Sequence, residues 1–193
     1  MQAIDPRLQL EPPAVAVRIW LFALVFALPM AITVFSLAAT MGSDEPKRLV
    51  ADSVMATWLA GAGMVAAVTL PLWWLLDRGL RRHRIEVGSH GLEIASAFYK
   101  RRLPLAQLKL DEARVVDLQE RTELKPASKS NAVSMPGFHG GWFRLRNRRK
   151  AFVATIGGPR VLWLPTHNDY DLLLQPRHPQ ALLEHLRKLA HDR

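Results

Sequence analysis

Two long runs without a charged residue or histidine dominate the first 76 residues of the chain. Ile19–Ser43 covers 25 residues and Ser53–Leu76 covers 24, and both are rich in Leu, Ala, Val and Phe. At 1.5 Å per residue, either run is long enough to cross a hydrocarbon core about 30 Å thick. We therefore expect a cytoplasmic tail at 1–17 and a transmembrane hairpin at 18–77, with helices at about 18–42 and 53–76.

The pattern changes after residue 77, where short apolar or alternating segments are separated by polar turns. Such a pattern is typical of strands. Seven strands are predicted: Arg84–Val87, Leu92–Ala97, Phe98–Leu105, Arg114–Leu118, Trp142–Arg146, Ala151–Ile156 and Val161–Leu164. Tyr170–Leu174 is a candidate for a last strand. The polar stretch Glu120–Pro136 has no periodicity and is predicted to be an exposed, mobile loop.

The chain closes with an amphipathic pattern over Pro179–Ala190. Leu182, Leu183, Leu186 and Leu189 fall on one helical face, which predicts a helix packed on a sheet. Residues 78–193 are therefore expected to form an α+β domain, with a bent antiparallel sheet of about seven strands and a capping C-terminal helix.

The net positive charge of the chain lies in this second part. The first 76 residues carry four basic and five acidic side chains, whereas the remaining 117 carry 22 and 12. The stretch directly after the second apolar run, Asp77–Arg84, holds four arginines, and positively charged loops stay in the cytoplasm. We expect both termini in the cytoplasm and the protein in a bacterial cytoplasmic (inner) membrane, which the absence of cysteine also fits.

A family resemblance appears in the second part. Pro136-Gly137-Phe138-His139-Gly140-Gly141-Trp142-Phe143-Arg144-Leu145, followed by Val161-Leu162-Trp163-Leu164-Pro165-Thr166 and a helix starting near Pro179, resembles the bacterial pleckstrin-homology-like (PH-like) domains that follow transmembrane hairpins. The resemblance covers roughly Arg84–Ala190. It implies a strongly bent sheet or partly open barrel capped by the C-terminal helix, and it brings no catalytic residue.

The basic segment after Trp142 is the main candidate site. If the strand continues to Arg148, then Arg144, Arg146 and Arg148 share one face, because side chains alternate along a strand. Lys100, Arg101 and Arg102 extend the same positive field if the fold brings them near. Such a face suits lipid phosphates or an acidic partner, and a simply solvated strand face is the alternative.

Other chemistry is not indicated. The seven histidines lack metal-site spacing, no Gly-x-Ser-x-Gly motif is present, and the glycine-rich Pro136–Gly141 lacks the ending of a phosphate-binding loop. Asp169 and Asp171 are expected in a turn rather than as a catalytic pair. No cofactor, metal, catalytic residue or nucleic-acid partner is expected, and neither apolar run holds an ionisable residue of the kind transport needs.

These patterns lead to a non-enzymatic, membrane-anchored binding module that engages a membrane protein or complex. An anionic-phospholipid sensor is the alternative, and a subunit of a membrane enzyme or transporter is the third reading. Small residues at helical spacing, Ala56, Ala60, Gly63 and Ala67, allow either a homo-oligomer or close packing of the hairpin on itself.

Overall fold

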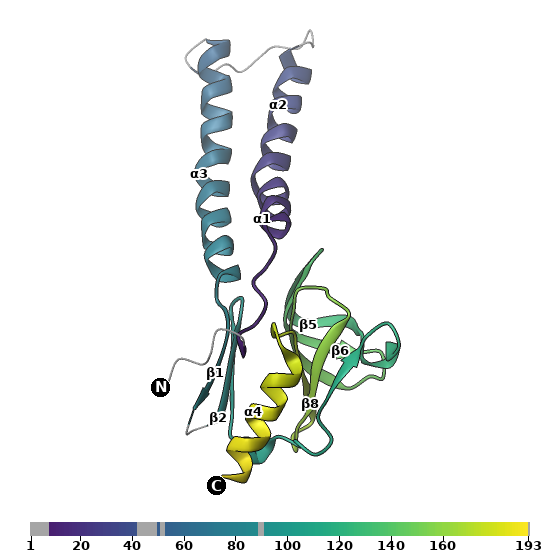
Figure 1. Cartoon of the computed structure of the whole chain (residues 1–193). Coiled ribbons are helices and arrows are strands. Elements are labelled where there is room, and N and C mark those ends of the chain that lie inside the picture. Colours follow the sequence, from purple (N-terminus) through teal and green to yellow (C-terminus); the bar gives the residue numbers. More distant parts are fainter. Residues whose placement is uncertain (1–7, 42–49, 51–52, 89–90, 193) are drawn as a thin grey trace. The chain divides into compact units, whose positions relative to one another are not determined.

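The computed structural model describes residues 8–41, 50, 53–88 and 91–192, and the chain falls into two compact units. One unit is the helical segment Arg18–Arg78. The other joins the segment before Arg18 to the whole of Gly79–Arg193. The two units are described separately below (Figure 1).

The helical unit contains two long helices that run in opposite directions. The first consists of α1 (Val15–Phe22), a π-helical turn (Ala23–Ala27) and α2 (Leu28–Met41), and the second is α3 (Val54–Leu80). Arg18 Nε lies 2.6 Å from Asp77 Oδ1, and the Phe22 and Trp73 rings are 5.6 Å apart. Both helices are long and apolar enough to cross a membrane, and few of their residues are buried within the protein.

Pro29 marks the irregular part of the first helix. Proline has no N–H group for the helical ladder, and the wide turn Ala23–Ala27 lies directly before it. The irregularity next to Pro29 is thus a π-helical turn. The helices predicted at 18–42 and 53–76 agree with these bounds within a few residues. The largest difference is at the end of α3, which continues to Leu80.

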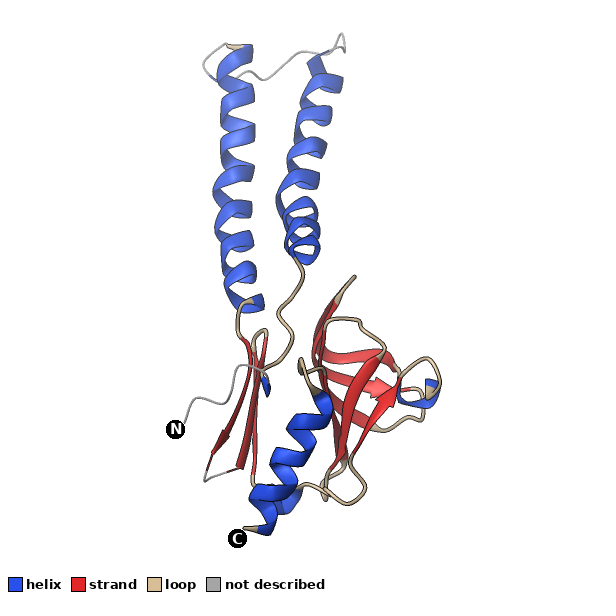
Figure 2. Cartoon of the chain, in the orientation of Figure 1, coloured by secondary structure: helices blue, strands red, loops and turns tan. Residues whose placement is uncertain are grey.

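The second unit contains two sheets and a C-terminal helix (Figure 2). A three-stranded antiparallel sheet has the order β1-β2-β3, with β1 His83–Gly88, β2 Gly91–Ser96 and β3 Tyr99–Leu103. A six-stranded sheet has the order β4-β8-β9-β7-β6-β5, with β4 Arg114–Asp117, β5 Pro126–Met135, β6 Phe138–Leu145, β7 Lys150–Thr155, β8 Arg160–Pro165 and β9 Tyr170–Leu174. Helix α4 spans Pro179–His191.

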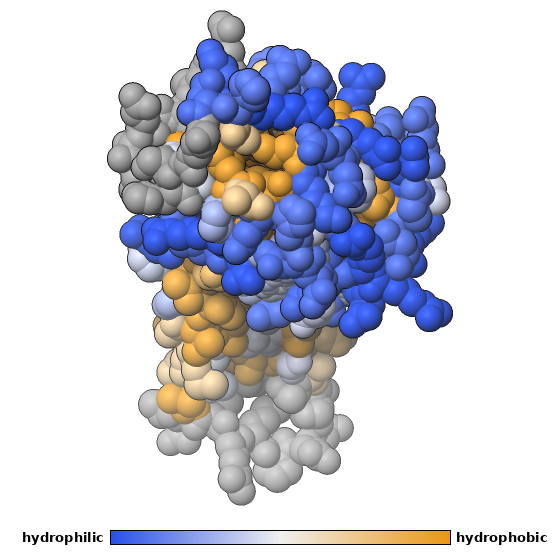
Figure 3. All heavy atoms as spheres, turned by 90° about the horizontal axis from the view of Figure 1, so that it is seen from below, coloured by the Kyte–Doolittle hydropathy of each residue, from blue (hydrophilic) through white to orange (hydrophobic). Residues whose placement is uncertain are grey.

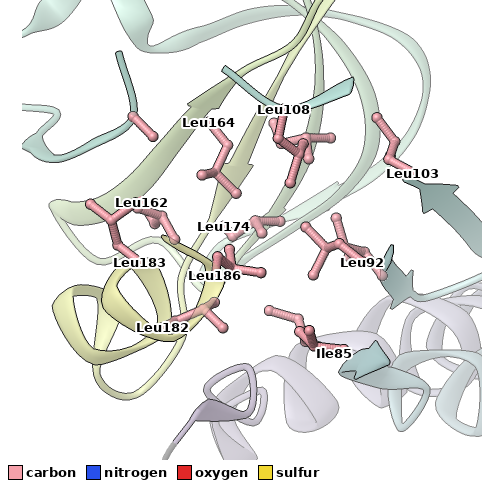
Figure 4. Packing of buried hydrophobic residues seen from close by; sticks show 14 of the residues in the cluster. Ile85, Leu92, Leu103, Leu108, Leu162, Leu164, Leu174, Leu182, Leu183 and Leu186 are labelled. Atoms are coloured by element: carbon pink, nitrogen blue, oxygen red, sulfur yellow. The ribbon is translucent and has the colours of Figure 1, made fainter. Parts of the chain in front are cut away.

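The main core lies between the two sheets and α4. Figure 4 shows leucines of α4, such as Leu182 and Leu186, meeting Leu162 and Leu174 of the large sheet and Ile85 of the small one. The opposite face of the large sheet carries a second cluster that includes Val153 and Phe143. The large sheet is therefore covered on both faces, and its inner strands are nearly continuous apolar runs.

On the face seen in Figure 3, hydrophilic residues of this unit surround an apolar patch, and the helices carry apolar residues. Large apolar side chains are exposed along the helices, among them Ile19, Phe35, Met55, Leu59 and Met64. In water such a surface would be unfavourable, because apolar area gains free energy when it is removed from water.

The predicted architecture needs three corrections. The predicted α+β class and the C-terminal helix are confirmed, but the described residues form nine strands in two sheets of three and six, rather than about seven strands in one bent sheet. The large sheet is not purely antiparallel, because β7 and β9 pair in parallel. The predicted loop Glu120–Pro136 was wrong: it contains β5, a polar edge strand that pairs only with β6.

The N-terminal segment forms part of the second unit. Leu8 and Leu10 are buried in the main core. The Gln9 side chain donates to the Ile85 carbonyl oxygen and accepts from the Ile85 N–H group, at 2.9 and 3.2 Å. Glu11 N donates to the Gln175 carbonyl oxygen at 3.0 Å. The stretch before the first helix is thus packed into the domain that follows the second.

Candidate functional site

Two basic side chains share the ring of Trp142 in the second unit. Lys150 Nζ lies 4.6 Å from the ring centroid and Arg101 Cζ lies 5.1 Å from it. Arg101 Cζ is also 5.4 Å from the ring of Tyr170, which meets Trp142 edge to face at 5.0 Å. We call Arg101, Trp142, Lys150 and Tyr170 the cation–aromatic cluster.

Strand alternation and register build this cluster. Trp142 on β6 pairs with Phe152 on β7, and their rings meet at 5.3 Å, so Trp142 stands on the face of the large sheet that carries the main core. Lys150 is the first residue of β7 and pairs with Arg144, which follows Trp142 by two residues on β6. Lys150 therefore lies on the same face of the large sheet as Trp142. Arg101 on β3 pairs with the fully buried Ile94 and so points from the small sheet towards that core.

The charges of the cluster are not balanced by acidic groups. Within the described part of the chain, neither Arg101 nor Lys150 forms an ion pair or a hydrogen bond through its side chain. Cations are attracted to an aromatic face, but two of them beside one ring repel each other. An anion between them would remove this repulsion, and the planar guanidinium suits carboxylate and phosphate oxygens.

The three arginines predicted to share a strand face do not do so. Strand β6 ends at Leu145, so Arg144 alone is on the strand. Arg146 and Arg148 lie in the turn to β7, where Arg148 has a φ of +67° and its N–H donates to the Leu145 carbonyl oxygen. The prediction failed because the strand ends at Leu145, three residues before Arg148.

The second basic run divides between the two faces of the small sheet. Lys100 Nζ is 2.5 Å from Glu93 Oε1, and Arg102 Nε pairs with the other oxygen of the same carboxylate. The charges of Lys100 and Arg102 are therefore balanced by Glu93, on the face of the small sheet that does not carry Arg101. Arg101 instead contacts the large sheet, where it and Lys150 lie beside the same Trp142 ring.

Asp171 was predicted both within the strand Tyr170–Leu174 and in a turn. The strand prediction is confirmed, and Asp171 is a fully buried residue of β9. Its carboxylate accepts from Arg149 Nη2 at 2.8 Å and from Trp163 Nε1 at 3.1 Å. Burial raises the pKa of Asp171, and the Trp163 hydrogen bond and the Arg149 charge act in the opposite direction. This arrangement joins β9 to β8 and to the turn that precedes β7, so we assign it a structural role.

Sequence reasoning missed Trp142, Lys150 and Tyr170 as partners of Arg101. Lys150 belongs to the basic run after Trp142, but its neighbours in space come from different sheets. No group of three or more potential metal ligands occurs in the parts of the chain that the structure describes.

No protein-family model matches the chain, and neither a curated protein nor a solved structure matches it. The resemblance to bacterial PH-like domains remains a prediction, and the functional argument rests on the chain's own geometry.

Proposed function

We propose that the protein is a non-enzymatic, membrane-anchored binding module. The helix pair spans the bilayer as a hairpin and holds a PH-like domain at the cytoplasmic face. Exposed apolar side chains along both helices support insertion into lipid. The packing of Leu8 and Leu10 into the core of the C-terminal domain supports an even number of crossings, because both segments must then lie on one side.

The domain binds an acidic cytoplasmic segment of a membrane protein through the cation–aromatic cluster. The observation that carries this proposal is that Arg101 and Lys150 share the Trp142 ring without an acidic partner among the described residues. The exposed Arg144, opposite Lys150, adds a third charge. Anchoring both partners in one membrane raises their effective concentration, so weak contacts suffice for assembly or regulation of a complex.

Anionic phospholipid is the second candidate partner. The same three cations favour it, since lipid phosphates bind clustered Arg and Lys side chains. Arginines at positions 78, 81, 82 and 84 follow the second apolar run directly and would lie near the anionic inner leaflet in the proposed orientation.

The two candidates are separated by extracting the full chain in native lipid discs and identifying both proteins and lipids by mass spectrometry. The test variant is Arg101→Gln/Arg144→Gln/Lys150→Gln, and the control is Arg160→Gln/Arg177→Gln/Lys188→Gln, which removes three exposed charges elsewhere. Near-UV circular dichroism checks that both variants fold.

Co-purification of one membrane protein in near-equal amount, lost in the test variant only, supports the protein-binding proposal. Enrichment of anionic lipid with the same dependence supports the lipid candidate. Retention of every partner by the test variant would show that the cluster is not the binding site.

A further inference from the structure

A second polar site lies on the other face of the large sheet, away from the cation–aromatic cluster. A pocket of about 390 Å³ is bounded by β5, the end of β7 and the turn that follows β7. Its lining includes Lys125, Lys129, Ser134, His139 and Thr155, and no Asp or Glu side chain contributes to it. The pocket is therefore polar and basic.

Three of these side chains form a row across neighbouring strands. His139 on β6 pairs with Ser134 on β5 and with Thr155 on β7. Ser134 Oγ lies 2.8 Å from His139 Nδ1, and the His139 ring meets Phe143 edge to face at 5.9 Å. The imidazole is thus held on both sides, and Nε2 makes no hydrogen bond to any residue that the structure describes.

The Thr155 hydroxyl makes no hydrogen bond to any described residue, and its oxygen is not fully enclosed, although Thr155 as a whole is only 3% exposed. The hydroxyl group is therefore open to the pocket, where it can meet solvent or a ligand. A valine has the same shape and would fill this position without an unmade hydrogen bond. The hydroxyl at the wall of a polar pocket therefore points to a ligand or solvent partner.

The charges in the pocket favour an anion. Lys125 and Lys129 form no ion pair within the described part of the chain. Burial lowers the pKa of His139, and the positive charge of Lys129 lowers it further. A neutral His139 that accepts from Ser134 through Nδ1 carries its proton on Nε2, where it can donate to an acceptor.

We propose that this pocket binds a phosphate monoester. The lysine ammonium groups, the Thr155 hydroxyl and His139 Nε2 supply several donors for the oxygens of one dianion. At about 30 Å³ per water molecule, the pocket of about 390 Å³ has room for roughly a dozen waters. This is more space than one phosphate group fills. The ligand therefore carries an organic part, and either a soluble phosphorylated metabolite or a lipid headgroup of the phosphatidic acid type supplies the same chemistry.

This site is separate from the proposed function, because it uses none of the residues of the cation–aromatic cluster. Binding is tested with the full chain in phosphatidylcholine discs. Glycerol 3-phosphate is titrated calorimetrically, and hydrogen–deuterium exchange across 125–135 is compared between plain discs and discs containing phosphatidic acid.

Lys129→Gln and Thr155→Val are the test variants, and Lys188→Gln on the exposed face of α4 is the charge control. We expect each test variant to weaken binding by about tenfold or more, the effect of losing a charge-assisted or buried hydrogen bond. Thr155→Val should leave the thermal stability unchanged or raise it, whereas a purely structural hydroxyl would lower it on removal.

Calorimetric binding of glycerol 3-phosphate that the test variants lose identifies a soluble ligand. Protection by phosphatidic acid alone, lost in the same variants, identifies the headgroup. The proposal is overturned if neither probe binds at millimolar concentration, or if binding is equal in the test variants and in Lys188→Gln. Binding that disappears only in the Arg101/Arg144/Lys150 variant also overturns it, because the ligand would then occupy the cluster.

Discussion

His83 illustrates how one buried ring ties the small sheet to the large one. It opens β1 opposite Ser96 on β2, with Nδ1 3.0 Å from Ser96 Oγ, and its ring meets Phe138 of β6 at 5.4 Å. Nε2 is buried without a hydrogen-bond partner in the described structure. Burial lowers the pKa of His83 to about 4, so the folded protein keeps this ring neutral.

This environment makes stability depend on pH. The unfolded chain takes up a proton at His83 near pH 6.5, whereas the folded chain does so only near pH 4. Stability should therefore be constant above pH 6.5 and fall by about 3 kcal/mol between these two values, because the unfolded state binds more protons there. Thermal unfolding in detergent, followed by near-UV circular dichroism, measures the change.

The comparison is between His83→Leu and the control His167→Gln, whose histidine is exposed. The first substitution should flatten the pH dependence, and the second should preserve it. An unchanged slope in His83→Leu would assign the acid sensitivity to other groups.

Gly141 occupies a position that only glycine fits. Its φ is +115°, and an added Cβ would lie 2.8 Å from both the Tyr99 ring and the Asn131 carbonyl oxygen. We expect Gly141→Ala to destabilise the domain by about 2 kcal/mol or more, through backbone strain and overpacking. Gly88→Ala is the matched control, because an added Cβ there meets nothing within 4 Å. Equal melting temperatures of the two variants would contradict this account.

At the level of elements, the sequence predicted best those segments whose hydrophobic pattern is set locally. The long helices and α4 were found within a few residues, since an apolar run or a 3.6-residue period does not depend on distant contacts. Strand β5 was missed for the opposite reason. It holds its place by backbone pairing with β6 and exposes polar side chains such as Ser128 and Asn131, so it shows no apolar alternation.

The candidate site was predictable only in part. The basic character of the segment after Trp142 was evident, but the contact of Arg101 with that ring depends on how two sheets pack. Alternation along β3 does separate Arg101 from Lys100 and Arg102, and this signal was available in the sequence. The sequence held no comparable signal for the turn that removes Arg146 and Arg148 from the strand.

Gln175 joins three segments at the end of β9. Its Oε1 accepts from the N–H groups of Ile156 and Gly158, at 3.0 and 3.1 Å, and its Nε2 donates to Glu11 Oε2 at 2.9 Å. Gln175→Leu should destabilise the domain by about 2–4 kcal/mol, because it leaves two amide groups unpaired.

Hydrogen–deuterium exchange gives a local measurement of the same effect. Exchange at residues 9–11 and 156–158 should become faster in Gln175→Leu. Gln180→Leu, which removes only an exposed contact with Glu184, should leave it unchanged. Identical exchange in the two variants would show that Gln175 does not anchor the N-terminal segment.

At the scale of the whole molecule, the absence of cysteine makes the proposed topology directly testable. Val50→Cys lies between the two long helices, and Ser128→Cys lies on the exposed strand β5. In intact bacterial cells, a membrane-impermeant maleimide should label Val50→Cys, and it should label Ser128→Cys only after permeabilisation. The unsubstituted chain is the blank, and labelling of both variants in intact cells would refute a hairpin with a cytoplasmic domain.

The packing of Leu8–Glu11 into the domain also has a consequence for biosynthesis. Glu11 leaves the ribosome before its partner Gln175, which follows 164 residues later. The core that contains Leu8 and Leu10 is therefore completed only after the long helices, both sheets and α4 have been translated. In the proposed topology, a nascent chain whose first helix inserted in the reverse direction would leave this segment on the opposite side of the membrane from the rest of its domain. Its domain would stay incomplete, so correct insertion becomes a condition for escaping cellular quality control.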